Sequence, residues 1–183
     1  MTLLLRRDVL PIAIRFNDYS SYYEDSEIDL YLNSVYIKEL ETIDDSIITV
    51  PIEITSDESI GSAGDDTMQI QRRIFLLSYS EVGLSPSPTT SQEGNPIEYF
   101  KNPSNRIAYC DKEHGRSPTG WFLRTPNTYF ESAVYSIGPN GEIGTGNANN
   151  ENGIRPAMCI KSDTKIKKAD FAKGDDHAYV IAQ

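Results

Sequence analysis

Asparagine and tyrosine side chains gather in two short segments of the C-terminal third of the sequence, 127–132 and 147–152. Asparagine favours loops because its short amide competes with the backbone for hydrogen bonds. Tyrosine offers a large contact area at low entropy cost, and asparagine offers adaptable donors and acceptors, as in binding loops. We therefore predict two loops that either bind a ligand or form ordinary turns with exposed aromatic rings. The predicted ligand-binding residues are Asn127, Tyr129, Phe130, Ser132, Tyr135, Asn147, Asn149, Asn150 and Asn152.

Patterns for catalysis or metal binding are weak. His114 and His177 are isolated, and no serine or cysteine stands in a motif that places a base beside it. Residues 147–158 partly resemble a calcium-binding loop, but Asn152 stands where such a loop needs glycine and Met158 where it needs glutamate. We expect no catalytic residue, no metal site and no cofactor.

Two arginines lie close to prolines in predicted strands, Arg124 and Arg155. A guanidinium there could bridge backbone carbonyls or carboxylates and hold two strands together. Recognition of a ligand is the alternative role. The predicted structural residues are Trp121, Arg124, Arg155 and Pro156.

The composition indicates one globular domain that does not bind nucleic acid. The chain has 183 residues and a net charge of −10, and 161–183 holds five lysines and four aspartates, so the negative excess lies in the body. Such a body would repel phosphate backbones. Apolar runs fall far short of the roughly 20 residues of a membrane helix, and the N-terminus is unlike a signal peptide. Cys110 and Cys159 are too few for a disulfide framework or a zinc site, although a single disulfide remains open.

The hydrophobic pattern predicts an α+β fold, with short helices in the N-terminal half and antiparallel strands with a hairpin in the C-terminal half. Ser26 with Asp29 forms a capping box that predicts a helix over 27–39, and Ser78 with Glu81 predicts a second, short helix. A further turn or two of helix is expected at 95–100. The predicted strands are 2–10, 12–16, 46–54, 74–77, 102–110, 121–125, 132–137, 142–145 and 153–160, with loops at 55–67, 85–96 and 111–120.

Several motifs together resemble a bacterial and prophage family of unknown function. The family carries a Trp-Leu-Arg-Ser-Pro strand, an Ala-Tyr-Val hairpin and a Gly-Val-Arg-Pro-Ala segment; this chain has "GWFLRTP" (120–126), "AVYSIGPNGEI" (133–143) and "GIRPAM" (153–158). The segments "SEIDLYLN", "IFLLSYSEVG" and "PIEYF" with "NRIAY" extend the resemblance over 2–162. Thr125 replaces the family's serine, and a strand that usually precedes "TLLLRRDVL" is missing.

The resemblance implies a single C-type-lectin-like domain over 1–162, with 163–183 as a C-terminal tail or added strand. Members occur in phage tail and bacterial surface proteins, so it implies a non-catalytic recognition module on a virion or cell surface. Its partners would be a host cell-surface protein or glycan and other subunits, and homo-oligomer formation is open. Related domains carry regions diversified by retroelements that mutate adenines, and the adenine-rich codons of the asparagine cluster fit such a variable protein.

Two other functions stay open. A purely structural tail or decoration subunit would need no ligand. Formylglycine-generating oxidases share the lectin-like architecture and use a cysteine pair, for which Cys110 and Cys159 are the candidates. Cys159 lies in a predicted strand of alternating apolar residues, where an inert buried thiol is commoner. The tail end "AYVIA" could add a strand to the domain or dock on a neighbour.

Overall fold

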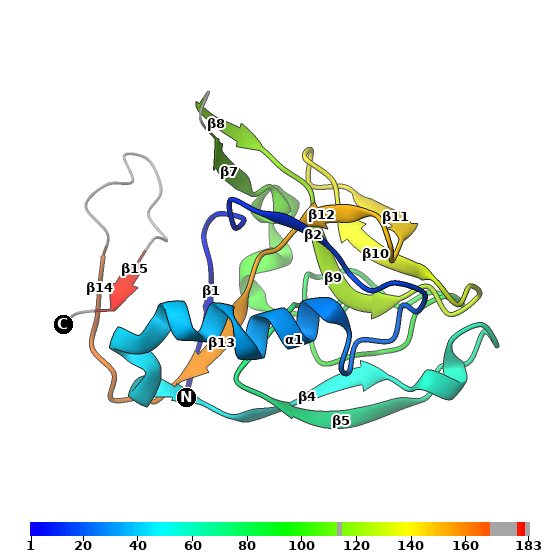
Figure 1. The fold of residues 1–183 in the computed structure, drawn as a ribbon, viewed down its shortest axis with the longest axis horizontal. Helices are drawn as coiled ribbons and strands as arrows, with labels where there is room; N and C mark the ends of the chain where they lie inside the picture. The colour runs from blue at the N-terminus through cyan, green and yellow to red at the C-terminus, as the bar shows by residue number, and fades with distance from the viewer. Residues whose placement is uncertain (113–114, 169–178, 182–183) are drawn as a thin grey trace.

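The computed structural model of the chain describes residues 1–112, 115–168 and 179–181 (Figure 1). The architecture is α+β, with strands in the majority. Strands occupy much of the N-terminal half as well, where the sequence had predicted short helices together with strands at 2–10, 12–16, 46–54 and 74–77. Within the described residues, no helix is long and apolar enough to cross a membrane. His114 and His177 lie outside the described residues.

A five-stranded sheet carries the two loops that the sequence singled out. Its strand order is β11, β10, β9, β12, β2, and every pair is antiparallel except β9 with β12. The loop 127–132 joins β9 to β10, and the turn 148–150 joins β11 to β12. The strand bounds are β2 Ala13–Arg15, β9 Trp121–Pro126, β10 Ala133–Ile137, β11 Ile143–Asn147 and β12 Glu151–Gly153.

The second sheet has four strands and is centred on β13 (Ala157–Ile160). Strand β1 (Thr2–Leu5) pairs with β13 along one edge, while β3 (Ile47–Ile48) and β6 (Ile74–Phe75) pair with its other edge. All four residues of β13 are buried, as expected for a central strand covered on both faces.

The single strand predicted over 153–160 is wrong, because its two ends belong to different sheets. Residues 154–156 lead from β12 to β13. Pro156 has no N–H to donate, and its carbonyl accepts a hydrogen bond of 2.9 Å from the amide of Arg6. The amide of Leu10 donates to the carbonyl of Ile154 at 2.9 Å, so this crossing is fastened to the N-terminal segment.

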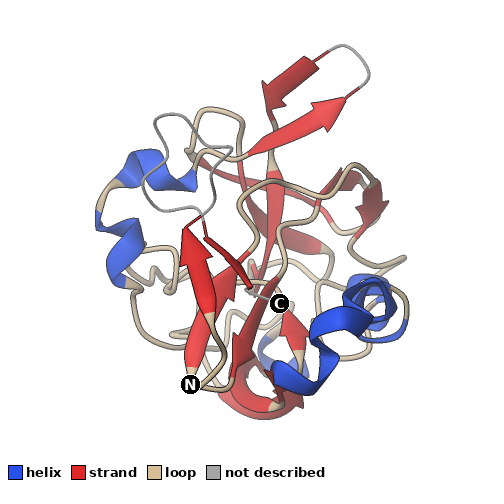
Figure 2. Cartoon of the chain, turned by 90° about the vertical axis from the view of Figure 1, so that its left-hand side faces the viewer, coloured by secondary structure: helices blue, strands red, loops and turns tan. Residues whose placement is uncertain are grey.

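Three two-stranded ribbons complete the β structure. They are β4 (Val50–Thr55) with β5 (Thr67–Arg72), β7 (Tyr109–Lys112) with β8 (Gly115–Pro118), and β14 (Ile166–Lys168) with β15 (Tyr179–Ile181). The predicted loop at 111–120 is therefore wrong, since most of it belongs to the second ribbon. Figure 2 views the molecule from the side of both termini and shows the β14–β15 ribbon in front.

Helix α1 (Glu27–Ser34) begins where the capping box predicted it. The Ser26 hydroxyl accepts a hydrogen bond of 3.3 Å from the Asp29 amide, and the Asp29 carboxylate accepts one of 3.1 Å from the Asp25 amide. The helix ends sooner than predicted, because residues 33–35 (Asn-Ser-Val) are poor helix formers. The chain continues as the 3₁₀ helix η1 (Tyr36–Ser46).

The other predicted helices are shorter than expected. At 78–81 both capping-box hydrogen bonds form, Ser78 N to Glu81 Oε2 at 2.9 Å and Glu81 N to Ser78 Oγ at 3.0 Å, yet the segment is only a turn. The helix expected at 95–100 is a 3₁₀ turn that begins three residues later. The 3₁₀ helices outside η1 are η2 Asp57–Ser59, η3 Glu98–Lys101 and η4 Pro103–Arg106.

One hydrophobic core draws on both sheets and on α1. Helix α1 contributes the fully buried Ile28 and Leu32 and contacts β2 and β6. The rings of Phe16 and Phe122 meet edge to face with centroids 5.7 Å apart. In Figure 1 the loop after β9 and the connection between β4 and β5 both lie at the right-hand end of the molecule.

Candidate functional site

The two loops predicted from their asparagine and tyrosine content lie side by side. The amide of Ala148 donates a hydrogen bond of 2.6 Å to the carbonyl of Ser132. Within the first loop, the amide of Asn127 donates to the carbonyl of Ala133 at 2.8 Å. The register of β10 and β11, which places Ala133 opposite Asn147, brings the two loops to the same end of the sheet.

A third loop, 17–21, is fastened to both of them. The amides of Phe16 and Asn17 donate to the carbonyl of Ala148 at 2.9 and 3.0 Å. The amide and hydroxyl of Ser21 both donate to the carbonyl of Glu131, at 2.9 and 3.1 Å. The composition of "NDYSSYYEDS" (17–26) predicts a loop, as the structure shows, but its place beside the other two loops was not predicted, although its Asn, Ser and Tyr content is the same.

A fourth loop comes from the connection between β4 and β5. The amide of Ala63 donates to the carbonyl of Thr128 at 2.9 Å. A Cβ atom added at Gly61 would lie 2.9 Å from Cγ of Glu131, so the Glu131 side chain covers this glycine. We call the surface formed by 17–21, 61–63, 127–132 and 147–150 the loop face.

Large aromatic side chains project from the loop face into solvent. Tyr129 is 50% exposed, Phe130 is 60% exposed and Tyr19 is 85% exposed. Two hydrogen bonds fix the backbone of the 127–132 loop. Asn127 Oδ1 accepts a hydrogen bond of 3.1 Å from the Tyr129 amide, and the Thr128 amide donates to the Thr89 carbonyl at 3.1 Å. Rings that are exposed on a fixed backbone lose little entropy on binding.

The asparagines of the second loop divide into two kinds. Asn147 accepts a hydrogen bond of 3.3 Å from the Asn149 amide through Oδ1 and so shapes the turn. Asn149 and Asn150 are exposed at its tip. Asn152 lies within β12, and its Oδ1 accepts a hydrogen bond of 2.8 Å from the Gly153 amide. The loop is therefore shorter than predicted, because Asn147 ends β11 and Glu151 begins β12.

Tyr135 is also set apart from the exposed aromatic residues. It is only 8% exposed, and its ring packs edge to face against Tyr79 at a centroid distance of 4.9 Å. Its hydroxyl lies 2.7 Å from Thr89 Oγ1 and accepts a hydrogen bond of 3.4 Å from Asn127 Nδ2. Tyr135 thus supports the loop face from beneath through Thr89 and Asn127. Ser132 is half-buried.

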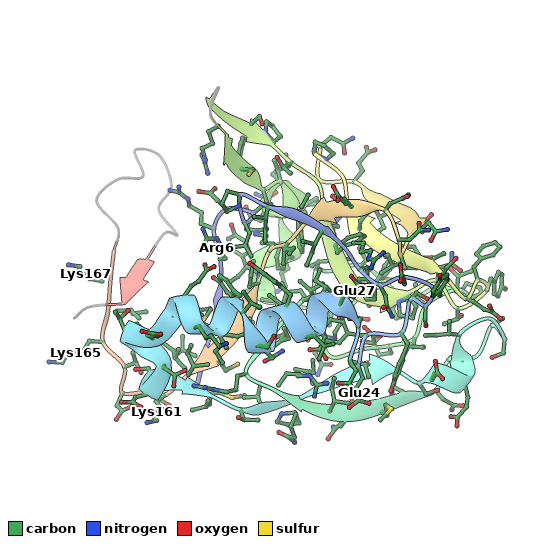
Figure 3. All side chains as sticks on the ribbon, in the orientation of Figure 1. Arg6, Glu24, Glu27, Lys161, Lys165 and Lys167 are labelled. Atoms are coloured by element: carbon green, nitrogen blue, oxygen red, sulfur yellow. The ribbon has the colours of Figure 1, made fainter. Side chains whose placement is uncertain are left out.

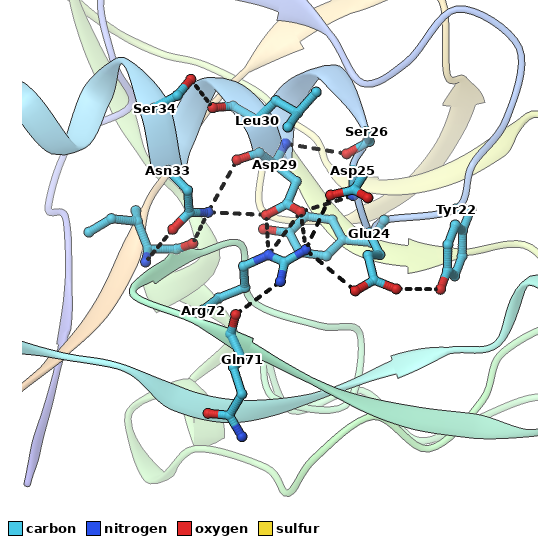
Figure 4. Close-up of polar contacts among 12 residues, drawn as sticks. Tyr22, Glu24, Asp25, Ser26, Asp29, Leu30, Asn33, Ser34, Gln71 and Arg72 are labelled. Atoms are coloured by element: carbon cyan, nitrogen blue, oxygen red, sulfur yellow. Dashed lines mark hydrogen bonds and ion pairs between the residues drawn. The ribbon is translucent and has the colours of Figure 1, made fainter.

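The surroundings of the loop face are acidic. Arg15 pairs with Glu27 at 2.7 Å and also with Asp18. Beside α1, Arg72 pairs with Asp29 at 2.8 Å, and its guanidinium lies 3.7 Å from both Glu24 and Asp25 (Figure 4). These carboxylates already neutralise both arginines.

The carboxylates near α1 help to raise the pKa of Tyr22, and three lysines lie at a distance from them. Burial, a hydrogen bond to Glu24 and the nearby carboxylates raise the pKa of Tyr22. In Figure 3, Lys161, Lys165 and Lys167 lie at the left-hand end of the molecule, away from Glu24 and Glu27. Carboxylates share that end, because the Lys161 amide donates to the carbonyl of Ser46 at the end of η1, which contains Glu39, Glu41, Asp44 and Asp45.

Arg124 is fully buried beneath the 78–94 segment and fastens it to the sheet. Its Nε donates to the Glu53 carbonyl at 2.8 Å, and Nη1 donates to the Leu76 carbonyl at 2.8 Å. The Glu81 carboxylate accepts from Nη1 at 2.7 Å and from Nη2 at 3.0 Å. This two-point pairing holds Glu81 in place and joins β9 to β4.

Glu93 is fully buried next to Arg124. Its Oε1 accepts hydrogen bonds from the amide and hydroxyl of Thr55 at 2.7 and 2.6 Å, and its Oε2 accepts one from the Thr125 hydroxyl at 2.5 Å. Arg124 Nε lies 3.7 Å from Oε2. Burial raises the pKa of Glu93, although Arg124 and the hydrogen bonds oppose this.

Residues 1–162 match the model of the family described as Domain of unknown function (DUF6273). The chain belongs to this family. Membership of a family of unknown function, expected from the sequence motifs, is thereby confirmed. No curated protein and no solved structure matches the chain.

In this DUF6273 domain, Arg155 and Trp121 occupy positions that the sequence had predicted to be structural. Arg155 donates to the carbonyls of Arg6 at 3.0 Å and Asn105 at 3.3 Å, and its guanidinium lies 5.2 Å from the centroid of the Trp121 ring. The Trp121 indole donates to the Arg106 carbonyl at 3.0 Å. These contacts join the 154–156 crossing to the N-terminal segment and to η4.

The remaining candidates for chemistry lie away from the loop face. Cys110 and Cys159 are buried and are not joined by a disulfide, and burial raises the pKa of the Cys159 thiol. A groove of about 490 Å³ lies between η4 and the turn after β10, at the opposite end of β10 from the loop face. Across the part of the chain that the structure describes, no cluster of three or more His, Cys, Asp or Glu could hold a metal ion.

Proposed function

We propose that this DUF6273 chain is a non-catalytic recognition module of a phage tail or bacterial surface assembly. In this proposal the loop face binds a protein or glycan on the host cell surface. The observation that carries the proposal is the exposure of Tyr129 and Phe130 on a loop whose backbone is hydrogen-bonded to four other segments. Exposed rings on a fixed backbone are typical of binding surfaces.

The position of the loops supports assigning the domain to the C-type-lectin-like folds. In such folds the last strands support long loops that meet at one end. Here the loop 127–132 and the turn 148–150 leave neighbouring strands and meet through the Ala148–Ser132 hydrogen bond. Retroelement diversification of the asparagine cluster remains part of this proposal, and the exposed Asn149 and Asn150 are the positions where variation would alter binding without disturbing the turn.

Adsorption to host cells tests the proposal. The variant Asn149→Ala with Asn150→Ala removes two exposed amides, while Asn147 continues to shape the turn. We expect a normal melting temperature and reduced removal of the protein from solution by host cells. Asn95→Ala, an exposed asparagine outside the loop face, is the matched control. Equal adsorption by wild type and both variants would count against recognition through Asn149 and Asn150.

A purely structural subunit is the second candidate, and the edge of β1 favours it. Strand β1 lies at the end of the β1–β13–β3 order, so its outer edge has no strand partner among the described residues. Leu3 on this strand is 37% exposed, and Met1 before it is 75% exposed. An open apolar edge is suited to pairing with another subunit. Light scattering of wild type and of Leu3→Lys tests pairing through this edge. A wild-type oligomer that dissociates in the Leu3→Lys variant supports the structural role. A monomeric wild type refutes self-assembly through β1.

The oxidase alternative has less support. It requires a reactive pair of thiols, whereas both cysteines are buried and the pKa of Cys159 is raised, which reduces the thiolate population. Normal host-cell adsorption by a Cys110→Ser variant would support a role that needs no thiol chemistry.

A further inference from the structure

Exposed aromatic rings make the loop face a docking surface, and its charge selects the partner. We infer that the loop face binds a lysine- or arginine-bearing protein segment, with cationic side chains over Tyr129 and Phe130 and against the surrounding carboxylates. This inference rests on the proposed recognition function and specifies the chemistry of its partner.

The segments that form or flank the loop face carry a strong excess of negative charge. The segments 15–29, 56–66, 127–132 and 147–151 are fully described and together contain eleven carboxylate side chains but only one cationic side chain, Arg15. Arg15 is already paired with Asp18 and Glu27. A partner that brings positive charge is therefore attracted, and a partner that brings phosphate or sulfate is repelled.

Many of these carboxylates are available to a partner. The following are exposed and form no ion pair with any described residue: Asp57, Glu58, Asp65, Asp66, Glu131 and Glu151. By contrast, the carboxylates of Asp29 and Glu81 are held by arginines. The unpaired set lies in the segments that form or flank the loop face and gives them net negative charge.

Glu131 joins the aromatic and the acidic parts of this surface. It follows Phe130 directly in the chain, its carbonyl is fixed by two hydrogen bonds from Ser21, and its side chain lies over Gly61. The carboxylate next to the ring of Phe130 in the chain therefore stands on a fixed backbone, where it can meet a cation that binds above this ring. Aromatic faces attract lysine and arginine, and a nearby carboxylate adds to this attraction. A neutral glycan would gain nothing from the charge.

Direct binding measurements test the inference. The probe is a synthetic decapeptide that alternates lysine and glycine, with matched polyglutamate and dextran as anionic and neutral probes. We expect binding of the lysine peptide only, and binding that weakens as sodium chloride rises from about 50 to about 500 mM. Glu131→Gln should weaken it by about threefold, and Tyr129→Ser with Phe130→Ser by about tenfold.

A charge-matched control separates the local surface from the overall charge. Glu142→Gln removes one exposed carboxylate at the far end of β10 and should change binding by less than about twofold. Equal weakening by Glu142→Gln and Glu131→Gln would overturn the inference, as would tighter binding of polyglutamate or dextran.

Host-cell adsorption distinguishes this inference from the proposed function. Adsorption that depends on Tyr129 and Phe130 but is unaffected by Glu131→Gln and by salt would retain the recognition module and overturn the cationic partner. Adsorption that depends on none of the three residues would overturn both. Adsorption that falls with Glu131→Gln and with salt supports both.

Discussion

The amide nitrogen of Ala148 lies 2.6 Å from the carbonyl oxygen of Ser132 and joins the two loops that leave β9 and β11. Ala148 is itself fully buried, and its carbonyl accepts from the amides of Phe16 and Asn17. One small residue therefore connects three loops of the surface. This arrangement makes the loop face a fixed platform rather than a set of independent turns.

Amide hydrogen exchange should report this connection. We expect the Ala148 amide to exchange much more slowly than the amide of Asn149, which donates only to a side chain at the exposed tip. Exchange of both amides at the same rate, measured by NMR at neutral pH, would show that the loops open independently.

Replacing Arg124 should destabilise the fold strongly. Arg124→Lys keeps the charge but loses the guanidinium that donates hydrogen bonds to Glu53, Leu76 and Glu81. Buried acceptors are therefore left unpaired. We expect a loss of roughly 3–5 kcal/mol in the free energy of unfolding, measured with urea. Arg15→Lys, which alters an exposed ion pair, is the control and should cause a much smaller loss. Equal losses of unfolding free energy in the two variants would contradict the structural role of the buried Arg124 hydrogen bonds.

The pH dependence of stability should contain a contribution from Glu93. Burial raises its pKa above the ordinary 4.5, so the folded protein holds this proton more tightly than the unfolded chain. The resulting stabilisation is full below pH 4.5 and is lost as the pH rises through the folded-state pKa. Glu93→Gln carries no titrating group at this position, so its free energy of unfolding should not show this decrease as the pH rises.

Urea unfolding of both proteins from about pH 4 to about pH 8 measures this difference. Glu98→Gln is the control, because the Glu98 side chain is 80% exposed and its removal should leave the wild-type profile unchanged. Parallel profiles for wild type and Glu93→Gln would show that Glu93 does not contribute.

Gly153 should tolerate no side chain. A Cβ atom there would lie 2.4 Å from the Gly120 carbonyl oxygen and 2.5 Å from a methyl of Val9, where β12 meets β9. We expect Gly153→Ala to cost roughly 1–3 kcal/mol of unfolding free energy. Gly146→Ala on β11 meets nothing within 4 Å and should change stability by less than about 0.5 kcal/mol. Comparable melting temperatures for Gly153→Ala and Gly146→Ala would contradict the close packing of Gly153 against Gly120 and Val9.

The sequence predicted those elements whose residues interact locally or alternate between faces. The capping box of Ser26 and Asp29 marks the start of α1, and the apolar residues of β9 and β10 mark two central strands. The ribbon β4–β5 was partly missed, because in β5 only Ile70 is buried and the alternation is too weak to detect. Strand β8 is exposed throughout and gives no hydrophobic signal.

Long-range contacts explain the remaining differences. The turn at 78–81 makes the hydrogen bonds of a helix start, but Glu81 is held by Arg124 from a distant strand, which local sequence cannot reveal. Composition identified the 127–132 and 147–150 loops, yet it could not show that Tyr135 is buried or that Asn152 lies in a strand. The loop at 17–21 joins them mainly through backbone hydrogen bonds, which residue types do not reveal, and through the Ser21 hydroxyl.

The most direct test of a recognition role is adsorption of the Tyr129→Ser, Phe130→Ser double variant to host cells. Val35→Ser is the matched control, because Val35 is also 50% exposed but lies at the end of α1. The melting temperatures of all three proteins should agree, since the substituted side chains are exposed. The proposed role predicts that the double variant loses most of its adsorption while Val35→Ser adsorbs like wild type. Undiminished adsorption by a folded double variant would contradict it.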